Sequence, residues 1–453
     1  MVEKDWESNR LTARMGRYAR VGSNVGGLAA KMAALRLVGF GSDSEKNASE
    51  VARVLGELKG PLMKVAQLLS TVPDLVPPEY AAELGNLQSN APPMGWPFVK
   101  RRMQAELGPS WKERFSSFEH VPSAAASLGQ VHRAAALEGE ALACKLQYPE
   151  MDSAVEADLS QFNALLALHK RFRPAIDTQE VAKEIGARLR EELDYFREAK
   201  HMALYALIFA NEPQVRIPNF FEELSTRRLL TMSWLEGKPI LDYRGHSQED
   251  RNNLSKVMFK AWWYPFSHFG VIHGDPHLGN YSVFEDSSGS SFGINLLDYG
   301  CLRIFPPTFV QGVVDLYRGL LEEDQEQIVS AYELWGFEGL TKPLIEVLNV
   351  WARFIYGPLL TDRTRSLVDG VSPAAYGRKE AFYVHQSLKE LGPIRIPRYF
   401  VFMDRAAIGL GGVFLHLKAD LNFYRLFNEQ IDGFTLSALE QRQAEALELA
   451  QIS

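Results

Sequence analysis

A loop followed by two short strands constrains the fold of this chain more than any other stretch of its sequence. The loop is "HGDPHLGN" (273–280), and "YSVFEDSSGSSFGINLLDYG" (281–300) follows with two strand-like runs around a Ser- and Gly-rich turn. If these runs pair as a hairpin, Asn280 lies beside Asp298. An amide oxygen and a carboxylate are hard ligands suited to Mg²⁺ on nucleotide phosphates. Asp275 would lie nearby to orient or deprotonate an attacking hydroxyl or water.

The spacing of these residues is typical of a phosphoryl-transfer site. Asp275 precedes Asn280 by five positions, and "LDYG" ends the second run. This order matches the catalytic Asp, Asn and Asp-Phe-Gly of kinases, with Tyr299 in place of phenylalanine. The alternative is a structural turn rich in Asp, Gly and Asn.

Two histidines in the loop raise the question of a metal site. His273 and His277 are four positions apart, a spacing that binds metals when both lie on one helix. Gly274 and Pro276 oppose a helix here. We therefore expect buried, hydrogen-bonded histidines rather than metal ligands.

A lysine lies inside an apolar strand upstream of the loop. In "EALACKLQYP" (140–149), Ala141, Ala143 and Lys145 share one face. Two alanines leave room for a flat base, and the lysine brings a cation to phosphates, as in the Val-Ala-Ile-Lys strand of kinases. The alternative is an edge-strand lysine that reaches water.

A buried lysine needs a carboxylate partner, because burying an unpaired charge is costly. "RLREELDYFREAKHM" (188–202) offers Glu191, Glu192, Asp194 and Glu198. A single helix over 178–210 would place Asp194 and Glu198 on one face and turn Glu192 away. Such a run of charges is also typical of an ordinary solvated helix face.

The expected glycine-rich phosphate loop is missing. Before the lysine strand the sequence is "PSAAASLGQVH" (122–132), with alanines at 124–126 where glycines would be expected. Alanine lacks the positive-φ freedom of glycine, so this loop must hold phosphates differently. By itself, a run of alanines is also compatible with a simple turn.

The remaining pattern predicts helices around a small β-rich part. Apolar residues recur at helical spacing between Ser44 and 104, with a helix over 79–88 and another beginning near Trp96. Strands are expected as a hairpin within 119–149 and within 226–240. Helices are expected over 151–173, around 248–270 and from the hairpin to the chain end, with 271–280 as a loop.

Composition excludes several classes. The net charge of −7 gives no general support for a nucleic-acid partner. Two cysteines, Cys144 and Cys301, fit a reducing compartment; they are expected to be small buried residues, with a nucleotide-protected thiol as the alternative. No apolar run reaches the roughly 18 residues of a spanning helix.

The N-terminal region has its own charge pattern. Residues 10–40 contain six basic residues and no acid. This arm is either solvated and flexible or lies on an anionic membrane surface. A transit peptide is disfavoured by Glu3, Asp5 and Glu7.

Taken together, these motifs resemble the UbiB-type atypical kinase-like family, which is linked to coenzyme Q (ubiquinone) biosynthesis. The resemblance covers roughly 45–420 and includes a helical extension whose KxGQ motif corresponds to "KVAQ" (64–67). Ala66 replaces the motif's glycine. The resemblance implies an α+β, protein-kinase-like two-lobe fold with a helical N-terminal extension. The expected parts are a basic arm at 1–43, the extension at 44–118, an N-lobe at 119–240 and a C-lobe with C-terminal helices at 241–453.

The resemblance also implies roles for individual residues. Lys145 would pair with Glu198, Asp275 would be catalytic, and the backbone near Met232 to Gly237 would contact adenine. The implied nucleotide-binding residues are Ala124, Ala125, Ala126, Ser127, Ala143, Lys145, Met232 and Leu235. The implied metal ligands are Asn280 and Asp298. The implied regulatory residues are Lys64 and Gln67 of the extension and Glu192 and Asp194 of the ExD motif.

The implied activity is that of an enzyme that binds ATP or ADP with Mg²⁺ and acts as an ATPase or a small-molecule or lipid phosphotransferase. The alternatives are a protein kinase, a nucleotide-binding pseudokinase scaffold, and an aminoglycoside- or choline-type phosphotransferase. The implied partners are a nucleotide, an anionic membrane surface, a lipid or quinone intermediate and a second copy of the chain. The implied location is cytoplasmic, with peripheral attachment to the inner face of a membrane.

Overall fold

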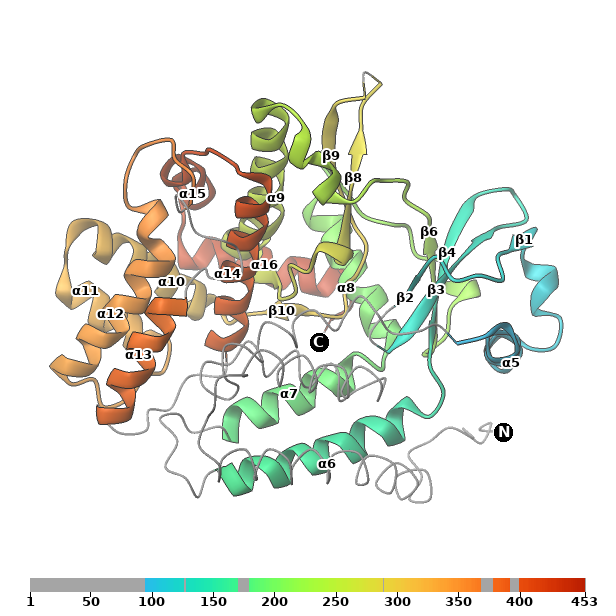
Figure 1. Ribbon diagram of the computed structural model, residues 1–453, viewed down its shortest axis with the longest axis horizontal. Helices are drawn as coiled ribbons and strands as arrows, with labels where there is room; N and C mark the ends of the chain where they lie inside the picture. The colour runs from blue at the N-terminus through green and yellow to red at the C-terminus, as the bar shows by residue number, and fades with distance from the viewer. Residues whose placement is uncertain are drawn as a thin grey trace, which may run out of the picture. The chain divides into compact units, whose positions relative to one another are not determined.

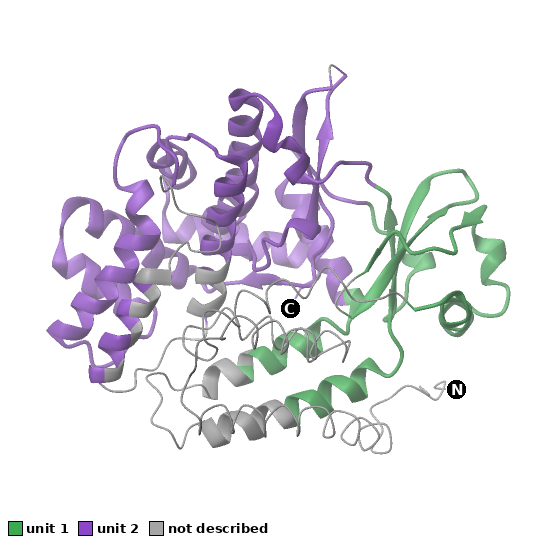
Figure 2. Cartoon of the chain, viewed as in Figure 1, with its two compact units in different colours: residues 1–173, 181–196, 219–234 green, residues 174–180, 197–218, 235–453 purple. Residues whose placement is uncertain are grey.

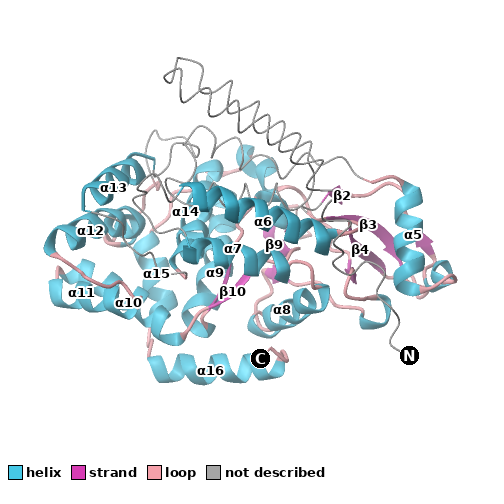
Figure 3. Cartoon of the chain, turned by 90° about the horizontal axis from the view of Figure 1, so that it is seen from below, coloured by secondary structure: helices cyan, strands magenta, loops and turns pink. Residues whose placement is uncertain are grey.

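The structure is a computed structural model that describes residues 94–125, 128–169, 179–287, 289–367, 378–391 and 399–452. The chain divides into two compact units (Figure 2). The first unit is Met1–Arg173, Val181–Phe196 and Asn219–Trp234, and the second is Pro174–Glu180, Arg197–Pro218 and Leu235–Ser453. Helices and antiparallel strands are both present (Figures 1 and 3), as the α+β prediction requires. The predicted arm, with Lys64 and Gln67 of the extension, lies outside the described residues.

The first unit is built on an antiparallel sheet in the order β1–β3–β4–β6, with β2 also paired to β3. The strands are β1 (Ser117–Phe118), β2 (Ala124–Ala125), β3 (Gly129–Ala135), β4 (Ala141–Gln147) and β6 (Leu229–Ser233). The predicted hairpin is confirmed as β3–β4, which turns at Gly139 with a φ of +91°. Because β6 pairs with the other edge of β4, the lysine strand is central rather than at an edge.

Helix α5 (Trp96–Leu107) begins at the predicted residue and supports the end of the lysine strand. Its Arg102 is buried, and the guanidinium donates from Nε to the carbonyl of Gln147 at 3.1 Å and from Nη2 to that of Tyr148 at 3.2 Å. A short 3₁₀ turn, η2 (Trp111–Arg114), leads from α5 into the sheet. These bonds fix the end of β4 to a helix.

The predicted helical stretch over 178–210 is present, but it is divided into two helices. The structure has α7 (Gln179–Glu191) and α8 (Tyr195–Ile208), and the ExD motif lies in the break between them. The Asp194 carboxylate accepts a hydrogen bond from the backbone of Phe196 at 3.1 Å, as an N-cap side chain does. Asp194 therefore precedes the helix that holds Glu198 and does not share a face with it.

The neighbouring helix, α6 (Met151–His169), is fastened to α7 by an ion pair. Arg190 donates from Nε and Nη2 to both carboxylate oxygens of Glu156, at 2.5 and 3.0 Å. Arg190 is half exposed, so the pair contributes little to stability.

A long buried helix, α9 (Gln248–Phe269), runs through the second unit. Ser247 caps its start, and Gly270 ends it in the left-handed region at φ +64°. Beside it lie two small sheets, one of β5 (Val215–Arg216), β9 (Ser291–Leu296) and β8 (Tyr281–Glu285), the other of β10 (Leu302–Ile304) and β7 (Val271–His273). The prediction that 271–280 is all loop is wrong for its first three residues, because they pair with β10.

Helices complete the second unit, as predicted (Figures 1 and 3). They are α10 (Pro307–Glu322), α11 (Gln325–Leu334), α12 (Lys342–Tyr356), α13 (Arg378–Leu391), α14 (Phe400–Leu417), α15 (Phe423–Ile431) and α16 (Leu436–Leu449). Short 3₁₀ turns are η4 (Glu222–Leu224) in the first unit, and η5 (Ile240–Gly245), η6 (Leu278–Asn280) and η7 (Gly357–Leu359) in the second. Within the described ranges, no helix is long and apolar enough to cross a membrane.

Candidate functional site

His273 is the structural centre of the loop. Its side chain is buried, and Nδ1 accepts the backbone N–H of Asp275 at 3.2 Å. Nε2 must therefore carry the proton that is shared with the carbonyl of Asp298 at 2.8 Å. The indole of Trp262, on α9, donates to the carbonyl of His273 at 2.9 Å. One imidazole thus ties Asp275 to Asp298 through their backbones.

The second histidine of the loop caps the turn that follows. His277 accepts the N–H of Gly279 at 3.1 Å and begins the 3₁₀ turn η6. No helix runs through 273–277, so the two histidines do not share a helix face. In the part of the chain that the structure describes, no group of three or more His, Cys, Asp or Glu is arranged to hold a metal ion.

Asn280 is oriented by the loop itself. Its side-chain amide donates from Nδ2 to the carbonyl of Asp275 at 3.0 Å, which fixes Oδ1 as the acceptor end. Its backbone N–H donates to the carbonyl of His277 at 2.9 Å. Since the amide nitrogen is engaged, the amide oxygen is the atom that a cation would use.

The hairpin brings Asn280 next to the "LDYG" segment. Tyr281 is the register partner of Leu296, and the N–H of Leu297 donates to the carbonyl of Asn280 at 2.9 Å. Asp298 is the next residue, and its Oδ1 accepts the N–H of Gly300 at 3.0 Å. The predicted neighbourhood of Asn280 and Asp298 is therefore present in the backbone register, with a buried Asp275 beside Asn280.

Tyr299, the variant residue of "LDYG", is fully buried. Its hydroxyl donates to the carbonyl of Leu296 at 2.8 Å, and burial raises its pKa well above the usual value, so it stays a neutral donor. Its backbone is held from α8: Glu198 accepts its N–H at 3.4 Å and His201 bonds to its carbonyl at 3.1 Å.

Three residues of this network were not predicted. His201 lies three positions after Glu198, a spacing that shares a helix face and could have indicated it. Trp262 and Tyr205, whose ring stands 5.9 Å from that of Tyr299, look like ordinary core residues in sequence. Their roles follow only from the fold.

Lys145 is in the first unit, at the centre of its sheet. It is only 8% exposed and faces Leu230 of β6 in the strand register. Its ammonium lies 5.4 Å from the ring centroid of Tyr195, a cation–π distance. The pairing of Lys145 with Glu198 joins the two units and stays a prediction.

The predicted base-binding residues have defined places in this sheet. Ala143 is buried opposite Met232, the residue expected near adenine. Leu235 is half-buried and is the first residue of its segment in the second unit. The boundary between units thus falls inside the segment from Met232 to Gly237 that we expected to contact adenine.

Half of the alanine-rich loop lies in the described residues. Ala124 and Ala125 are exposed and form β2, opposite Val131 and Gln130; Ala126 and Ser127 lie outside those residues. Gly129, the one glycine in this stretch, was not singled out. A Cβ there would stand 2.2 Å from the carbonyl oxygen of Leu146, so only glycine allows this close approach to the lysine strand.

Both cysteines are buried, as predicted. Thr231 donates to Sγ of Cys144 at 3.8 Å, and burial raises the pKa of this thiol to about 12. Arg303 donates to Sγ of Cys301 at 3.6 Å. Cys144 is therefore a protonated core residue at neutral pH.

An antiparallel sheet with a buried lysine on a central strand, and a helical unit with this Asp–Asn loop and hairpin, define a protein-kinase-like class. The chain belongs to the ABC1 atypical kinase-like domain family, whose pattern matches residues 86–332, more than half of the 453 residues. This confirms the resemblance to UbiB-type proteins.

Several known proteins are similar over much of the chain. The AarF domain-containing protein kinase 1 of Xenopus laevis is 32% identical over 272 residues, which is 60% of this chain and 52% of that protein. Atypical kinase COQ8, mitochondrial, of Saccharomyces cerevisiae is 29% identical over 268 residues, 59% of this chain and 53% of that protein. The chain spans about half the length of the curated relatives it matches.

A solved structure extends the likeness to most of the fold. The complex structure of Rv3197-erythromycin from Mycobacterium tuberculosis aligns with a TM-score of 0.58 and 27% sequence identity. The alignment covers 89% of this chain and 99% of that chain.

Proposed function

We propose that this protein binds ATP or ADP with Mg²⁺ and acts as an ATPase or a small-molecule or lipid phosphotransferase. The carrying observation is the loop–hairpin network. Asn280 is turned by its bond to the backbone of Asp275, and the hairpin register supplies Asp298 one residue away. Three groups with the chemistry of a phosphoryl-transfer site are thus connected by hydrogen bonds from the His273 and Asn280 side chains to the backbone and by the pairing of the hairpin.

The side chains fit a Mg²⁺ ion. The amide oxygen of Asn280 and the carboxylate of Asp298 are hard oxygen ligands, and few protein ligands suffice because Mg²⁺ keeps waters and binds phosphates. A bound Mg²⁺ would neutralise charge on the phosphates. Asp275, which is 4% exposed, would orient the acceptor and take its proton.

Lys145 would supply the second positive charge to the phosphates. Its low exposure and its place against Tyr195 restrict the side chain to few orientations. Glu198 is its proposed partner and already holds the backbone of Tyr299. Glu198 would then connect Lys145 with the "LDYG" segment, which contains the proposed metal ligand Asp298.

We extend the proposal to ubiquinone or membrane-lipid metabolism, with a lipid or quinone intermediate as acceptor. Two relatives are named as COQ8 atypical kinases, and the exposed alanines 124–125 replace a glycine-rich loop. The KVAQ segment, whose family counterpart covers the protein-substrate side, supports a small acceptor. Peripheral attachment through the basic residues of 10–40 and a homodimer belong to the same proposal.

The decisive test combines nucleotide binding with turnover. Mg-ADP is expected to raise the melting temperature of the full chain, and Mg-ATP to be hydrolysed, with and without anionic liposomes. Asp298→Asn is expected to lose the Mg-dependent shift, while the exposed Asp242→Asn keeps it as a charge-matched control. Absence of any shift in the parent chain would refute the proposal; a shift without turnover would favour the pseudokinase scaffold.

A further inference from the structure

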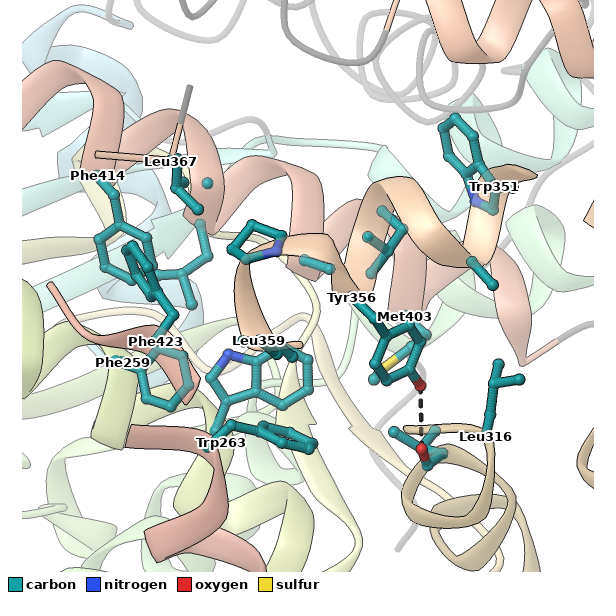
Figure 4. Close-up of a pocket in the computed structure, with 18 of the residues that line it drawn as sticks. Phe259, Trp263, Leu316, Trp351, Tyr356, Leu359, Leu367, Met403, Phe414 and Phe423 are labelled. Atoms are coloured by element: carbon teal, nitrogen blue, oxygen red, sulfur yellow. Dashed lines mark hydrogen bonds between the residues drawn. The ribbon is translucent and has the colours of Figure 1, made fainter. Parts of the chain in front are cut away.

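The second unit contains an apolar pocket away from the loop described above. Its walls come from α9, α10, α11, α12, η7, α14 and α15, and it encloses about 910 Å³ of empty space, counting the part open to solvent. Figure 4 shows the rings of Phe259, Trp263, Phe414 and Phe423 around one end and Trp351 toward the other. The cavity that a water-sized group could occupy is about 80 Å³, several times the minimum that holds one water molecule.

The lining is apolar and largely aromatic. Among the described residues that line the pocket, none is Asp, Glu, Lys, Arg or His. The rings of Phe259, Phe414 and Phe423 lie within 5.5 to 6.4 Å of one another, and Trp263 meets Phe427 at 5.8 Å. These pairs brace one another, which keeps the aromatic end open.

Three polar side chains of the lining, Tyr332, Trp335 and Tyr356, are engaged by the protein. Tyr356 donates its hydroxyl to the carbonyl of Val313 at 3.1 Å, the bond drawn in Figure 4. Tyr332 donates to Asn349 at 2.9 Å, and the indole of Trp335 donates to the carbonyl of Phe309 at 3.0 Å. A guest would therefore contact mainly hydrocarbon and ring surfaces.

A packing defect does not explain a space of this size. Protein interiors are packed as densely as organic crystals, and ordinary voids are about the size of a water molecule. The side chains that could close it are present and large, yet they face the space: Trp263, Trp351 and Met403 are each 8% exposed. Most of the lining residues come after residue 332, where the match to the ABC1 atypical kinase-like domain ends.

We propose that this pocket binds an uncharged hydrocarbon group of a few carbon atoms, such as the terminal unit of an isoprenoid chain whose remainder extends toward solvent. The absence of charge in the described lining disfavours an ionised guest inside, since a buried unpaired charge is costly. Burial of apolar surface against the aromatic end would supply the binding free energy.

The same helices that wall the pocket also hold the loop 273–280. On α9, Trp262 donates to His273, and the next residue, Trp263, lines the pocket. On α14, a Cβ at Gly409 would stand 2.3 Å from Cγ of Pro276, and the next residue, Leu410, lines the pocket. A guest and the loop therefore share two rigid supports.

The test is a titration of the full chain with farnesol, an uncharged isoprenoid alcohol, followed by tryptophan emission. Trp263, Trp335 and Trp351 lie in the lining and report directly. Saturable quenching is expected with farnesol and not with hexaethylene glycol, which has similar length but is polar. The titration is done without nucleotide, and Asp275→Asn should bind farnesol like the parent, so the result is independent of the proposed catalytic function.

Two substitutions on one helix give a matched control. Ala407 lines the pocket, so Ala407→Phe should weaken farnesol binding by about tenfold or more, because a phenyl group takes the place of several methylenes. Gly412 is outside the lining, and a Cβ there would meet nothing within 4 Å, so Gly412→Phe should bind like the parent. If Ala407→Phe does not fold by circular dichroism, Ala352→Leu on α12 replaces it.

A competition experiment distinguishes the chain of a membrane lipid from a free small molecule as the source of the guest. Displacement of farnesol by lysophosphatidylcholine would assign the pocket to the chain of a membrane lipid; retention of farnesol would assign it to a free molecule. The proposal is overturned if the parent shows no saturable binding. It is equally overturned if both pocket-filling variants, folded, bind farnesol as the parent does.

Discussion

The loop 273–280 and the apolar pocket lie in the same unit and are built in opposite ways. The loop comes from consecutive residues whose side chains are fixed by backbone hydrogen bonds, with His273 engaged at both ring nitrogens. The pocket takes between one and five residues from each of seven elements, together with Trp335 and Leu367, and is shaped by ring contacts. A polar site thus needs precise local geometry, whereas an apolar one needs only volume that neighbouring helices leave unfilled.

The largest effect is expected from the chemistry of the loop. Asp275→Asn keeps the shape of the side chain but removes its basicity, so kcat for ATP hydrolysis should fall by roughly 10²–10⁴-fold. Mg-ADP binding, measured by calorimetry, should change little, because Asn280 and Asp298 remain. A parent-like kcat would show that Asp275 is not the proton acceptor.

The next prediction compares filled and unfilled core on one helix. Leu316 and Leu320 are both buried on α10, at 1% and 3% exposure, but only Leu316 lines the pocket. Leu→Ala substitutions cost about 2–5 kcal/mol, more where the new cavity is larger. Leu316 already borders empty space, so its truncation removes fewer contacts. The loss of unfolding free energy, measured with denaturant, should therefore be near the upper end of this range for Leu320→Ala and near the lower end for Leu316→Ala. Equal losses would mean that the pocket is closed in solution.

A third prediction tests the contact between α14 and the loop. Gly409→Ala would place a methyl group 2.3 Å from the rigid ring of Pro276, so it should destabilise by about 1–3 kcal/mol through overpacking and lower the hydrolysis rate as well. Gly412→Ala, three positions along the same helix, meets nothing and should stabilise by roughly 0.5–1 kcal/mol. The prediction is checked by measuring the unfolding free energy and the steady-state hydrolysis rate of both variants under the same conditions. Identical behaviour of the two variants would remove the link between the pocket wall and the loop.

The smallest effect concerns Cys144 and alkaline pH. Burial raises the pKa of its thiol from 9.0 to about 12, so between these values the unfolded chain releases a proton that the folded chain keeps. This contribution to stability is complete below pH 9 and is lost as pH rises toward 12. At pH 10 the loss is on the order of 1 kcal/mol. The unfolding free energy of the parent chain should fall between pH 8 and pH 10 by this amount more than that of Cys144→Ala. If both fall equally, the loss comes from other groups.

The parts that could be predicted from sequence are those with local signals. Alternating apolar residues around Gly139 gave the β3–β4 hairpin, and a Ser- and Gly-rich turn gave the β8–β9 hairpin. The placement of Asn280 next to Leu297 then follows from antiparallel pairing alone. The sequence alone therefore predicts that Asn280 and Asp298 lie close together, and the hairpin register agrees.

The parts that could not be predicted depend on distant residues. Apolar periodicity continues through Leu193, so the break between α7 and α8 is hidden, and only the bond from Phe196 to Asp194 reveals it. Strand β7 is three residues long and exists because β10 pairs with it. The pocket has no sequence pattern at all, since apolar helices look alike whether or not their neighbours fill the space between them.

The hairpin of β8 and β9 has a practical consequence for anyone who wishes to watch this site. The end that carries Asn280 is locked by the pair of Tyr281 with Leu296, whereas the tip is closed separately by the bond from Asp286 to Ser290. A shift of register already occurs between Phe284 and Glu285, near the tip. An inserted residue or a fluorophore at the tip would therefore be absorbed locally, which makes it an attachment point for a reporter that leaves the working end of the hairpin unchanged.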